Sequence, residues 1–211
     1  MIGSEDEAKA WLTEQFGAAT LSRLELLAEL LVTENAAQNL IAAGTVPHLF
    51  QRHVADSAQL LRFVSRETAG HWLDLGSGAG FPGLVVAACR PDWAVGLVES
   101  RPLRVDWLQR AALALKLENV TVFGSRVERL ETMQCDVISA RAFAPLLKTL
   151  HVAARFSTSE TLWLLPKGRS AQQELATAGS SADMFHVEQS FTDPDAGILV
   201  GQIGGKRGGK A

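Results

Sequence analysis

The spacing of hydrophobic residues changes once along the chain, near residue 70. Before that point, apolar residues recur three or four positions apart, as in helices with one buried face. Ser4 and Glu7 stand at the spacing of a capping box and predict the start of a first helix. A second helix is expected to end in the amide-rich stretch 33–44, and Pro47 suits the first turn of a third. Residues 1–70 are therefore predicted to form a helical extension.

After residue 70, short apolar runs alternate with longer helical patterns. Runs that are hydrophobic throughout are typical of strands buried on both faces of a parallel sheet and joined by crossovers. The last two runs are separated only by the turn-forming sequence TDPDA, which favours a closing antiparallel hairpin. The predicted strands lie within 71–75, 94–99, 120–124, 135–140, 161–168, 183–191 and 197–203. We expect residues 71–205 to form a Rossmann-like α/β domain, with a mostly parallel seven-stranded sheet and an antiparallel last strand.

Composition narrows the class of protein. The chain has 211 residues, is 47% hydrophobic and carries a formal net charge of −3, which suits one substantial core. Its N-terminus is acidic and no run of about 18 uncharged apolar residues occurs, so neither a signal peptide nor a membrane span is expected. Cys89 and Cys135 lie in apolar segments without metal-type or disulfide-type spacing. We expect a cytoplasmic monomer without bound metal, ending in a flexible basic tail at residues 206–211.

A glycine-rich loop follows the first predicted strand directly. Gly78, Gly80 and Gly83 match G-x-G-x-x-G, which by itself indicates only a nucleotide-shaped ligand. Asp74 stands two residues before Gly76, where its carboxylate would repel a pyrophosphate and attract a cation. S-adenosylmethionine carries an ammonium and a sulfonium group. The loop therefore favours this methyl donor over a dinucleotide.

Glu99 ends the second predicted strand, where a carboxylate can bind both hydroxyl groups of an adenosine ribose. Enzymes that use NAD share this feature, so a nicotinamide-binding oxidoreductase stays open as an alternative. A solvated acid at a strand end is the other interpretation. Phe81, within the loop, is expected either beside the cofactor or in the core.

The segment after the fourth predicted strand reads SARAFAP, at the sheet edge where ligands of this fold gather. It holds neither an Asn-Pro-Pro-aromatic arrangement for an exocyclic amine nor a Pro-Cys nucleophile, and Cys135 is expected in the core. A ring nitrogen such as guanine N7 has a free lone pair and needs no base, so transfer requires mainly orientation in a dry pocket. Arg141 is the candidate catalytic residue, holding base or cofactor. A structural salt bridge is the alternative for Arg141.

Several motifs together resemble the glucose-inhibited division protein B (GidB) family, the bacterial small-subunit ribosomal RNA guanine-N7 methyltransferases. In chain order they are NAAQNLI, RHVADS, LDLGSGAGFPG, GSRVE, DVISARAFAPL and LLPKG, within residues 35–168. The resemblance implies a class I S-adenosylmethionine-dependent methyltransferase fold behind the N-terminal helices. It also implies methyl transfer to N7 of one guanine in the decoding-region hairpin of 16S rRNA, naked or within the 30S subunit. A small-molecule methyltransferase is the remaining alternative.

The resemblance also assigns residues to the cofactor. Gly76, Phe81, Val127, Glu128 and Arg141 match cofactor-contacting positions of the family. Val127 and Glu128 follow the third predicted strand, where a backbone N–H and a carboxylate can meet the edge of the adenine. Packing in the core would account for Val127 equally well.

The candidate RNA-binding residues are Asn39, His53, Arg126 and Lys167. Arg126 and Lys167 fall at strand ends and would form a cationic rim for phosphate, unless they are merely solvated. His53 and Asp56 lie one helical turn apart, so a contact between imidazole and carboxylate is available. His53 would then orient the N-terminal helices over the cofactor or contact a flipped guanine. The chain lacks the Pro-Arg-rich final segment of many family members, which puts RNA contact through its C-terminus in doubt.

Overall fold

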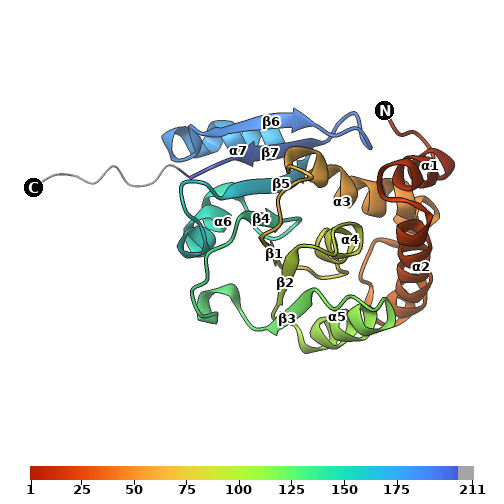
Figure 1. The fold of residues 1–211 in the computed structure, drawn as a ribbon. Helices are drawn as coiled ribbons and strands as arrows, with labels where there is room; N and C mark the ends of the chain where they lie inside the picture. The colour runs from red at the N-terminus through yellow and green to blue at the C-terminus, as the bar shows by residue number, and fades with distance from the viewer. Residues whose placement is uncertain (204–211) are drawn as a thin grey trace, which may run out of the picture.

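The computed structural model describes residues 1–203, with a seven-stranded sheet at its centre (Figure 1). The strands are β1 (His71–Leu75), β2 (Ala94–Glu99), β3 (Val120–Gly124), β4 (Val137–Ala140), β5 (Leu162–Gly168), β6 (Phe185–Gln189) and β7 (Gly197–Gly201). Their order is β3-β2-β1-β4-β5-β7-β6, with β1 to β5 parallel and β7 antiparallel to β5 and β6. The predicted sheet, with its antiparallel last strand, is confirmed. The predicted basic tail, residues 206–211, lies outside the described residues.

Alternate residues of the central strands face opposite sides of the sheet, and both sides are covered. Trp72 and Leu164 belong to the core shared with α4 (Gly83–Cys89) and α5 (Pro102–Ala114). Leu73 and Trp163 belong to the core shared with α6 (Leu146–Ala153) and α7 (Ala171–Ala178). Figure 1 shows these helix pairs on opposite sides of the sheet. This double burial explains why the strands read as uninterrupted apolar runs.

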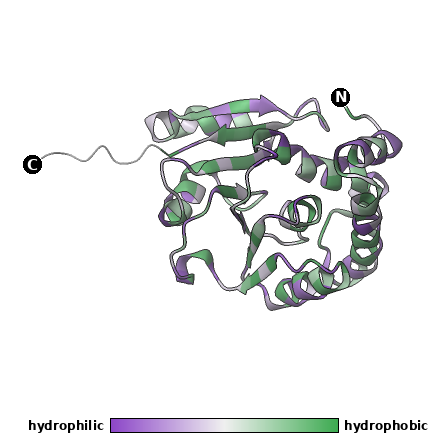
Figure 2. Cartoon of the chain, in the orientation of Figure 1, coloured by the Kyte–Doolittle hydropathy of each residue, from purple (hydrophilic) through white to green (hydrophobic). Residues whose placement is uncertain are grey.

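The helix α2 (Ala18–Gln38) packs over α4 and α5, and α1 (Glu5–Phe16) packs against α2 and the segment around residue 50. The Ser4 hydroxyl accepts a hydrogen bond from the backbone N–H of Glu7 at 3.2 Å, so the predicted helix start is confirmed. Both helices mix hydrophilic and hydrophobic residues along their length, as helices with one buried face do (Figure 2). Their buried leucines join the same core as α4, which ties the helical extension to the sheet domain.

The predicted third helix is irregular. Residues 43–63 form η1 (Ala43–His48), the π-helix η2 (Phe50–Ala55), α3 (Asp56–Ala58) and η3 (Gln59–Phe63). Pro47 lies inside the 3-10 helix η1 and not in the first turn of an α-helix. The backbone N–H groups of Phe50 and Gln51 donate to the Glu5 carboxylate of α1 at 2.9 and 2.7 Å. This contact between elements interrupts the regular ladder, which the local sequence alone does not reveal.

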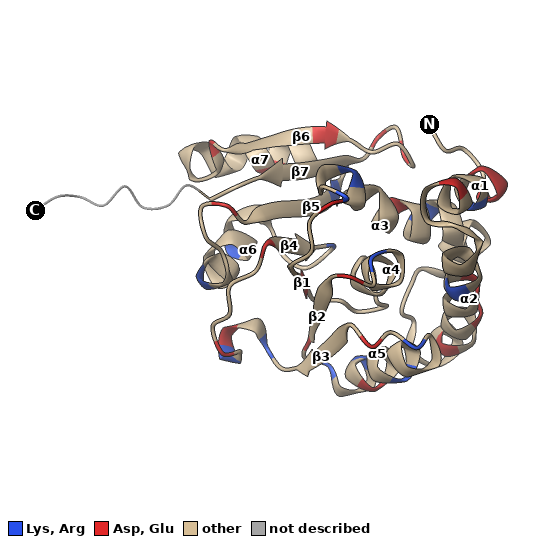
Figure 3. Ribbon diagram, viewed as in Figure 1, with Lys and Arg blue, Asp and Glu red and all other residues tan. Residues whose placement is uncertain are grey.

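The remaining short helices are η4 (Val127–Arg129), η5 (Ala154–Phe156) and η6 (Gly179–Ala182). Charged residues lie mainly on the helices and connecting segments, and the strands carry few of them (Figure 3). Within residues 1–203, no helix is both long and apolar enough to cross a membrane.

Candidate functional site

Two cavities lie at the carboxyl ends of the parallel strands, on either side of the segment that follows β4. The first, here called the glycine-loop cavity, has a volume of about 430 Å³ and is lined by the ends of β1, β2 and β3. The second, the hairpin cavity, has a volume of about 660 Å³ and is lined by η1 and η2, the end of β5 and the β6–β7 connection. Ala142, Phe143 and Ala144 line both cavities. A group transferred between the cavities would therefore pass beside this segment.

The glycine loop donates its N–H groups to acceptors of the protein itself. Gly83 N, at the start of α4, donates to Asp74 Oδ2 at 3.2 Å, and Gly78 N donates to Glu99 Oε2 at 3.2 Å. Gly80 N donates to the carbonyl of Ser77 at 2.7 Å. A pyrophosphate site in a dinucleotide-binding fold needs such amides free, with no carboxylate among them. The loop geometry therefore disfavours a dinucleotide.

Asp74 lies inside the core, with no exposed surface. Its Oδ1 accepts a hydrogen bond from Ser139 Oγ at 2.8 Å, which joins β1 to β4. Burial raises the pKa of this carboxyl above its usual value, against the hydrogen bonds from Ser139 and Gly83 that lower it. The sequence predicted a carboxylate facing the ligand, but both oxygens are turned toward the protein. A role in cofactor binding stays a prediction, and in this geometry Asp74 would act by holding the loop.

Glu99 connects the glycine loop to the end of β2. Its Oε1 accepts the N–H groups of Ser100 and Arg101 at 2.7 and 2.9 Å, while Oε2 accepts that of Gly78. The residue is only 6% exposed yet lines the glycine-loop cavity, so the alternative of a solvated strand-end acid is wrong. A carboxylate fixed by three backbone donors is preorganised to bind hydroxyl groups of a ligand.

The opposite wall of the glycine-loop cavity is the turn after β3. Val127 is buried there, whereas Arg126 and Glu128 are exposed. Arg155 Nη2 donates to the carbonyls of Val127 and Leu130 at 2.7 and 2.6 Å, which fixes the turn. The structure thus brings these residues to the same cavity as Glu99.

Gly76 allows Phe143 to approach the floor of the glycine-loop cavity. The residue has φ +69°, and a β-carbon there would lie 2.7 Å from Phe143 Cδ2. Only glycine combines this conformation with this contact. The sequence analysis did not identify Phe143 as a site residue. Its position as an aromatic residue in the segment after the fourth strand could have indicated that it lines the cavity.

Arg141 is held between His53 and Asp56. Its Nη2 lies 3.2 Å from His53 Nδ1 and its Nη1 lies 3.4 Å from Asp56 Oδ2. The expected contact between His53 and Asp56 is therefore wrong, because both side chains meet the guanidinium instead. His53 lies in the π-helix η2, so the α-helical spacing assumed for His53 and Asp56 does not apply. The alternative of a structural salt bridge for Arg141 accounts for only one of its two partners.

His53 is uncharged at neutral pH. Burial lowers its pKa to about 3, and the charges of Arg141 and Arg52 add to this effect. Since Nδ1 accepts from Arg141, Nε2 carries the proton and donates to Thr45 Oγ1 at 2.8 Å. The ring stacks on Phe81 at 5.3 Å, and Phe81 is 3% exposed below both His53 and Arg141. Phe81 thus forms the shared floor of this cluster.

The lowered pKa of His53 makes folding stability depend on pH. Below the unfolded-state pKa of 6.5, the unfolded chain binds a proton that the folded protein excludes until about pH 3. The free energy of unfolding should therefore fall by ~2 kcal/mol between pH 7 and pH 5 from this residue. Urea titrations of the protein and of His53→Asn at both pH values measure this loss. An equal loss in the variant would assign the pH dependence to other groups.

Two predicted RNA-binding residues are not placed as expected. Lys167 was expected on the rim, but its side chain is 8% exposed; Nζ donates to the Ala144 carbonyl at 2.6 Å and pairs with Glu174 at 3.0 Å. It therefore braces the segment after β4. Asn39 is exposed at the end of α2, with φ 51°, and lines neither cavity. Cys135 is buried and burial raises the pKa of its thiol to about 11, so its predicted place in the core is confirmed.

Two relatives with high sequence identity to this chain carry the name of a ribosomal RNA methyltransferase. The chain is 60% identical over 205 residues to the ribosomal RNA small subunit methyltransferase G of Novosphingobium aromaticivorans, covering 95% of this chain and 89% of the relative. It is 57% identical over 203 residues to the protein of that name from Erythrobacter litoralis, covering 96% and 98%.

Solved structures show the same fold at low identity. A SAM-dependent methyltransferase from Aquifex aeolicus gives a TM-score of 0.56 at 16% identity, covering 74% of this chain and 93% of that one. A mutant of MtNAS in complex with S-adenosylmethionine gives 0.58 at 16% identity, covering 95% and 84%. The predicted class I methyltransferase fold is confirmed. A family model described as GidB, rRNA small subunit methyltransferase G, matches residues 20–195, and the chain therefore belongs to the GidB family that its motifs predicted.

Proposed function

We propose that this protein transfers a methyl group from S-adenosylmethionine to N7 of a guanine in the decoding-region hairpin of 16S rRNA. The relatives carry the name of a small-subunit ribosomal RNA methyltransferase, and the fold is that of methyltransferases. The cluster around Arg141 supports the choice of acceptor.

The glycine-loop cavity suits S-adenosylmethionine, which when bound supplies an electrophilic methyl group. Glu99 has the position and the fixed orientation to bind the ribose hydroxyls. Gly76 lines this cavity with its backbone, and Val127 with Glu128 would hold the adenine. The Gly83 amide at the start of α4 donates to Asp74 and the Leu84 amide to the Gly80 carbonyl, which weighs against the nicotinamide alternative.

In the described part of the chain, the hairpin cavity offers Arg141 but no free base, and this observation carries the proposal. Two of its carboxylates, Asp193 and Glu174, form ion pairs with Arg52 and Lys167. The Asp56 carboxylate is bound by Arg141, Gln59 and Thr192. Both ring nitrogens of His53 are also engaged. An exocyclic amine must lose a proton during methylation, whereas guanine N7 attacks through its own lone pair. A pocket without a free base therefore suits N7, with further N–H groups of Arg141 available for the neighbouring O6.

Binding of the RNA itself is proposed through exposed cations. Arg126 is exposed on the rim of the glycine-loop cavity, next to Arg101 and Lys148. These side chains can contact phosphate groups without reading the base sequence. We propose 16S rRNA or the 30S subunit as the partner of a cytoplasmic monomer.

A substrate with one atom changed tests the proposed acceptor. Decoding-region RNA transcribed with 7-deazaguanosine carries C–H where guanine has N7, so it has no lone pair to methylate. We expect labelled methyl to enter guanosine-containing RNA, or 30S particles from cells lacking the enzyme, and not the deaza RNA. Methylation of the deaza RNA would exclude N7, and labelling of small metabolites alone would exclude an RNA substrate.

A further inference from the structure

A buried polar cluster connects the last hairpin to Arg141. Its members are Gln59, Ser190 and Thr192, which are 1%, 1% and 2% exposed, together with Asp56. Asp56, Ser190 and Thr192 border the hairpin cavity, whereas Gln59 lies behind them. Buried polar groups in a core stabilise a protein only when their hydrogen bonds are complete. The cluster lies behind Arg141, where it can orient the carboxylate that holds this side chain.

The orientation of the Gln59 amide is determined by a backbone group. The N–H of Phe191 can only donate, and it lies 3.1 Å from Gln59 Oε1. The opposite side of the amide, Nε2, therefore faces Asp56 and donates to its Oδ1 at 2.8 Å. Thr192 Oγ1 donates to the same oxygen at 2.9 Å. Oδ1 of Asp56 is thus occupied by neutral donors, and Oδ2 is left for Arg141.

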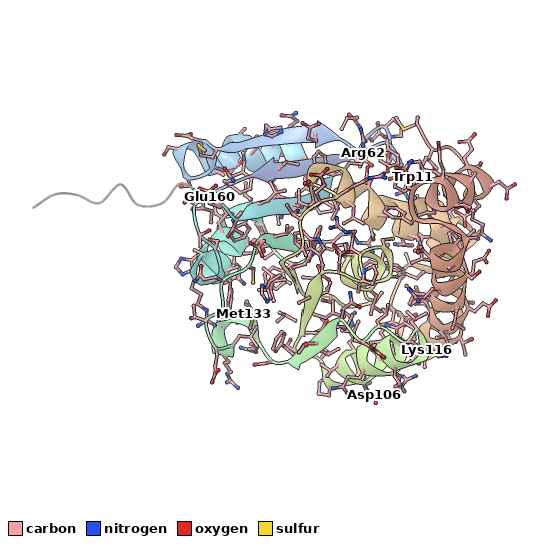
Figure 4. All side chains as sticks on the ribbon, viewed as in Figure 1. Trp11, Arg62, Asp106, Lys116, Met133 and Glu160 are labelled. Atoms are coloured by element: carbon pink, nitrogen blue, oxygen red, sulfur yellow. The ribbon has the colours of Figure 1, made fainter. Side chains whose placement is uncertain are left out.

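Phe191 is itself anchored at the N-terminal side of the molecule. Its ring packs against Trp11 at 5.0 Å and under the Arg62 guanidinium at 5.0 Å. Figure 4 labels these two side chains, which lie near each other beside α1 and the hairpin. The Phe191 carbonyl also accepts from Ile2 N at 2.7 Å. A chain of contacts therefore leads from Trp11 of α1 to the ring of Phe191, and from the backbone N–H of Phe191 to the Gln59 amide.

We propose that Gln59 is a positioning residue for Arg141, acting through the carboxylate of Asp56 that it and Thr192 orient. The inference rests on the proposed role of Arg141 in methyl transfer. Gln59 touches neither cavity and so contributes no contact to substrate or cofactor. The helical extension and the last hairpin then have a shared task, which is to fix one guanidinium beside the segment that lines both cavities.

The isosteric substitution Gln59→Glu tests this role. One oxygen of the introduced carboxylate still accepts from Phe191, but the other faces Asp56 Oδ1, and two carboxylates in this position must share a proton. The other charged groups nearby are Arg141, Arg62 and the Arg52–Asp193 ion pair, while His53 is neutral. While both carboxylates are ionised, repulsion displaces Asp56 and with it Arg141. When the shared proton is bound, the carboxyl group introduced at position 59 can donate a hydrogen bond to Asp56 Oδ1, as the Gln59 amide does.

The expected result is a pH-dependent defect in kcat for 16S rRNA methylation. At about pH 8 the variant should turn over about tenfold more slowly than the wild type, and at about pH 6 within about twofold of it. Its affinity for S-adenosylmethionine, measured by calorimetry, should be unchanged. Gln15→Glu is the control matched for charge, because Gln15 Oε1 accepts a hydrogen bond from Arg66 and the side chain is hydrogen-bonded to neither Asp56 nor Thr192. It should give the wild-type pH profile.

The inference would be overturned if the ratio of variant to wild-type kcat were the same at both pH values. This comparison requires that Gln59→Glu has the melting temperature of the wild type. If Gln59→Glu does not fold, Gln59→Met decides: we expect at least about a threefold loss of kcat with unchanged cofactor affinity, because the amide donor to Asp56 is removed at a residue that lines neither cavity. An unchanged kcat in that variant would equally overturn it. A failure of the proposed function would give a different result, because the wild-type protein itself would then not methylate 16S rRNA.

Discussion

Arg141→Ala should lower kcat for methylation of 16S rRNA by at least about 100-fold, the usual cost of removing a preorganised donor from an active site. The side chain is 20% exposed, its guanidinium lies between His53 Nδ1 and Asp56 Oδ2, and the residue stands at the start of the segment that lines both cavities. Without it, O6 of the guanine would lose its proposed donor and N7 its proposed fixed direction. Single-turnover assays with saturating S-adenosylmethionine measure this loss separately from product release.

Arg141→Lys is the matched control for charge. A lysine keeps the positive charge but cannot donate to His53, Asp56 and a base from one planar fork. We expect it to recover less than about a tenth of the lost rate. Near-normal turnover in the lysine variant would show that charge alone is required, and near-normal turnover in the alanine variant would remove Arg141 from the reaction. Calorimetry with S-adenosylmethionine tests its predicted cofactor contact, since only a direct contact makes affinity fall in both variants.

Glu99→Ala should weaken binding of S-adenosylmethionine by about 100-fold or more, from the loss of charge-assisted hydrogen bonds worth ~1.5–3 kcal/mol each. The carboxylate accepts from three backbone N–H groups and, at 6% exposure, cannot be replaced there by water without disordering the loop. The variant loses both the proposed ribose contact and the acceptor that holds Gly78. Calorimetric titration of the folded variant, checked by its melting temperature, measures the effect.

Glu128→Ala serves as the comparison for Glu99. Glu128 lines the same cavity but is exposed, so its removal should change affinity by less than about tenfold. A larger effect for Glu128 than for Glu99 would place the main cofactor contact on the turn after β3. Equal affinity of Glu99→Ala and wild type would contradict the proposed cofactor site.

The sheet could be predicted from local sequence because its strands are buried on both faces. A doubly buried strand must be apolar at nearly every position, so β1, β2 and β4 appear as short hydrophobic runs whatever their neighbours are. The glycine loop could be predicted for a related reason, since the positive φ of Gly76 and Gly78 excludes most other residues. These features depend on the backbone and on burial, which one stretch of chain specifies by itself.

The irregular third helix could not be predicted in the same way. Its interruption depends on a carboxylate of α1, Glu5, which accepts the N–H groups of Phe50 and Gln51. Asp74 and Lys167 were likewise identified as candidates but misplaced, because only packing shows which way a side chain turns. The sequence does not distinguish a charged residue at a strand end that faces solvent from one that faces the protein interior. Arg126 is of the first kind, whereas Lys167 donates to a buried carbonyl group.

The sequence by itself determined the succession of strands along the chain, the glycine loop after β1 and the family to which the chain belongs. Only the tertiary structure decided what surrounds Arg141. Its partners Asp56 and His53 stand 85 and 88 positions away, and Thr192 lies 136 positions from Asp56. The reason is physical: local periodicity reports burial and backbone conformation, whereas the direction of a hydrogen bond depends on groups that meet only when distant segments pack together.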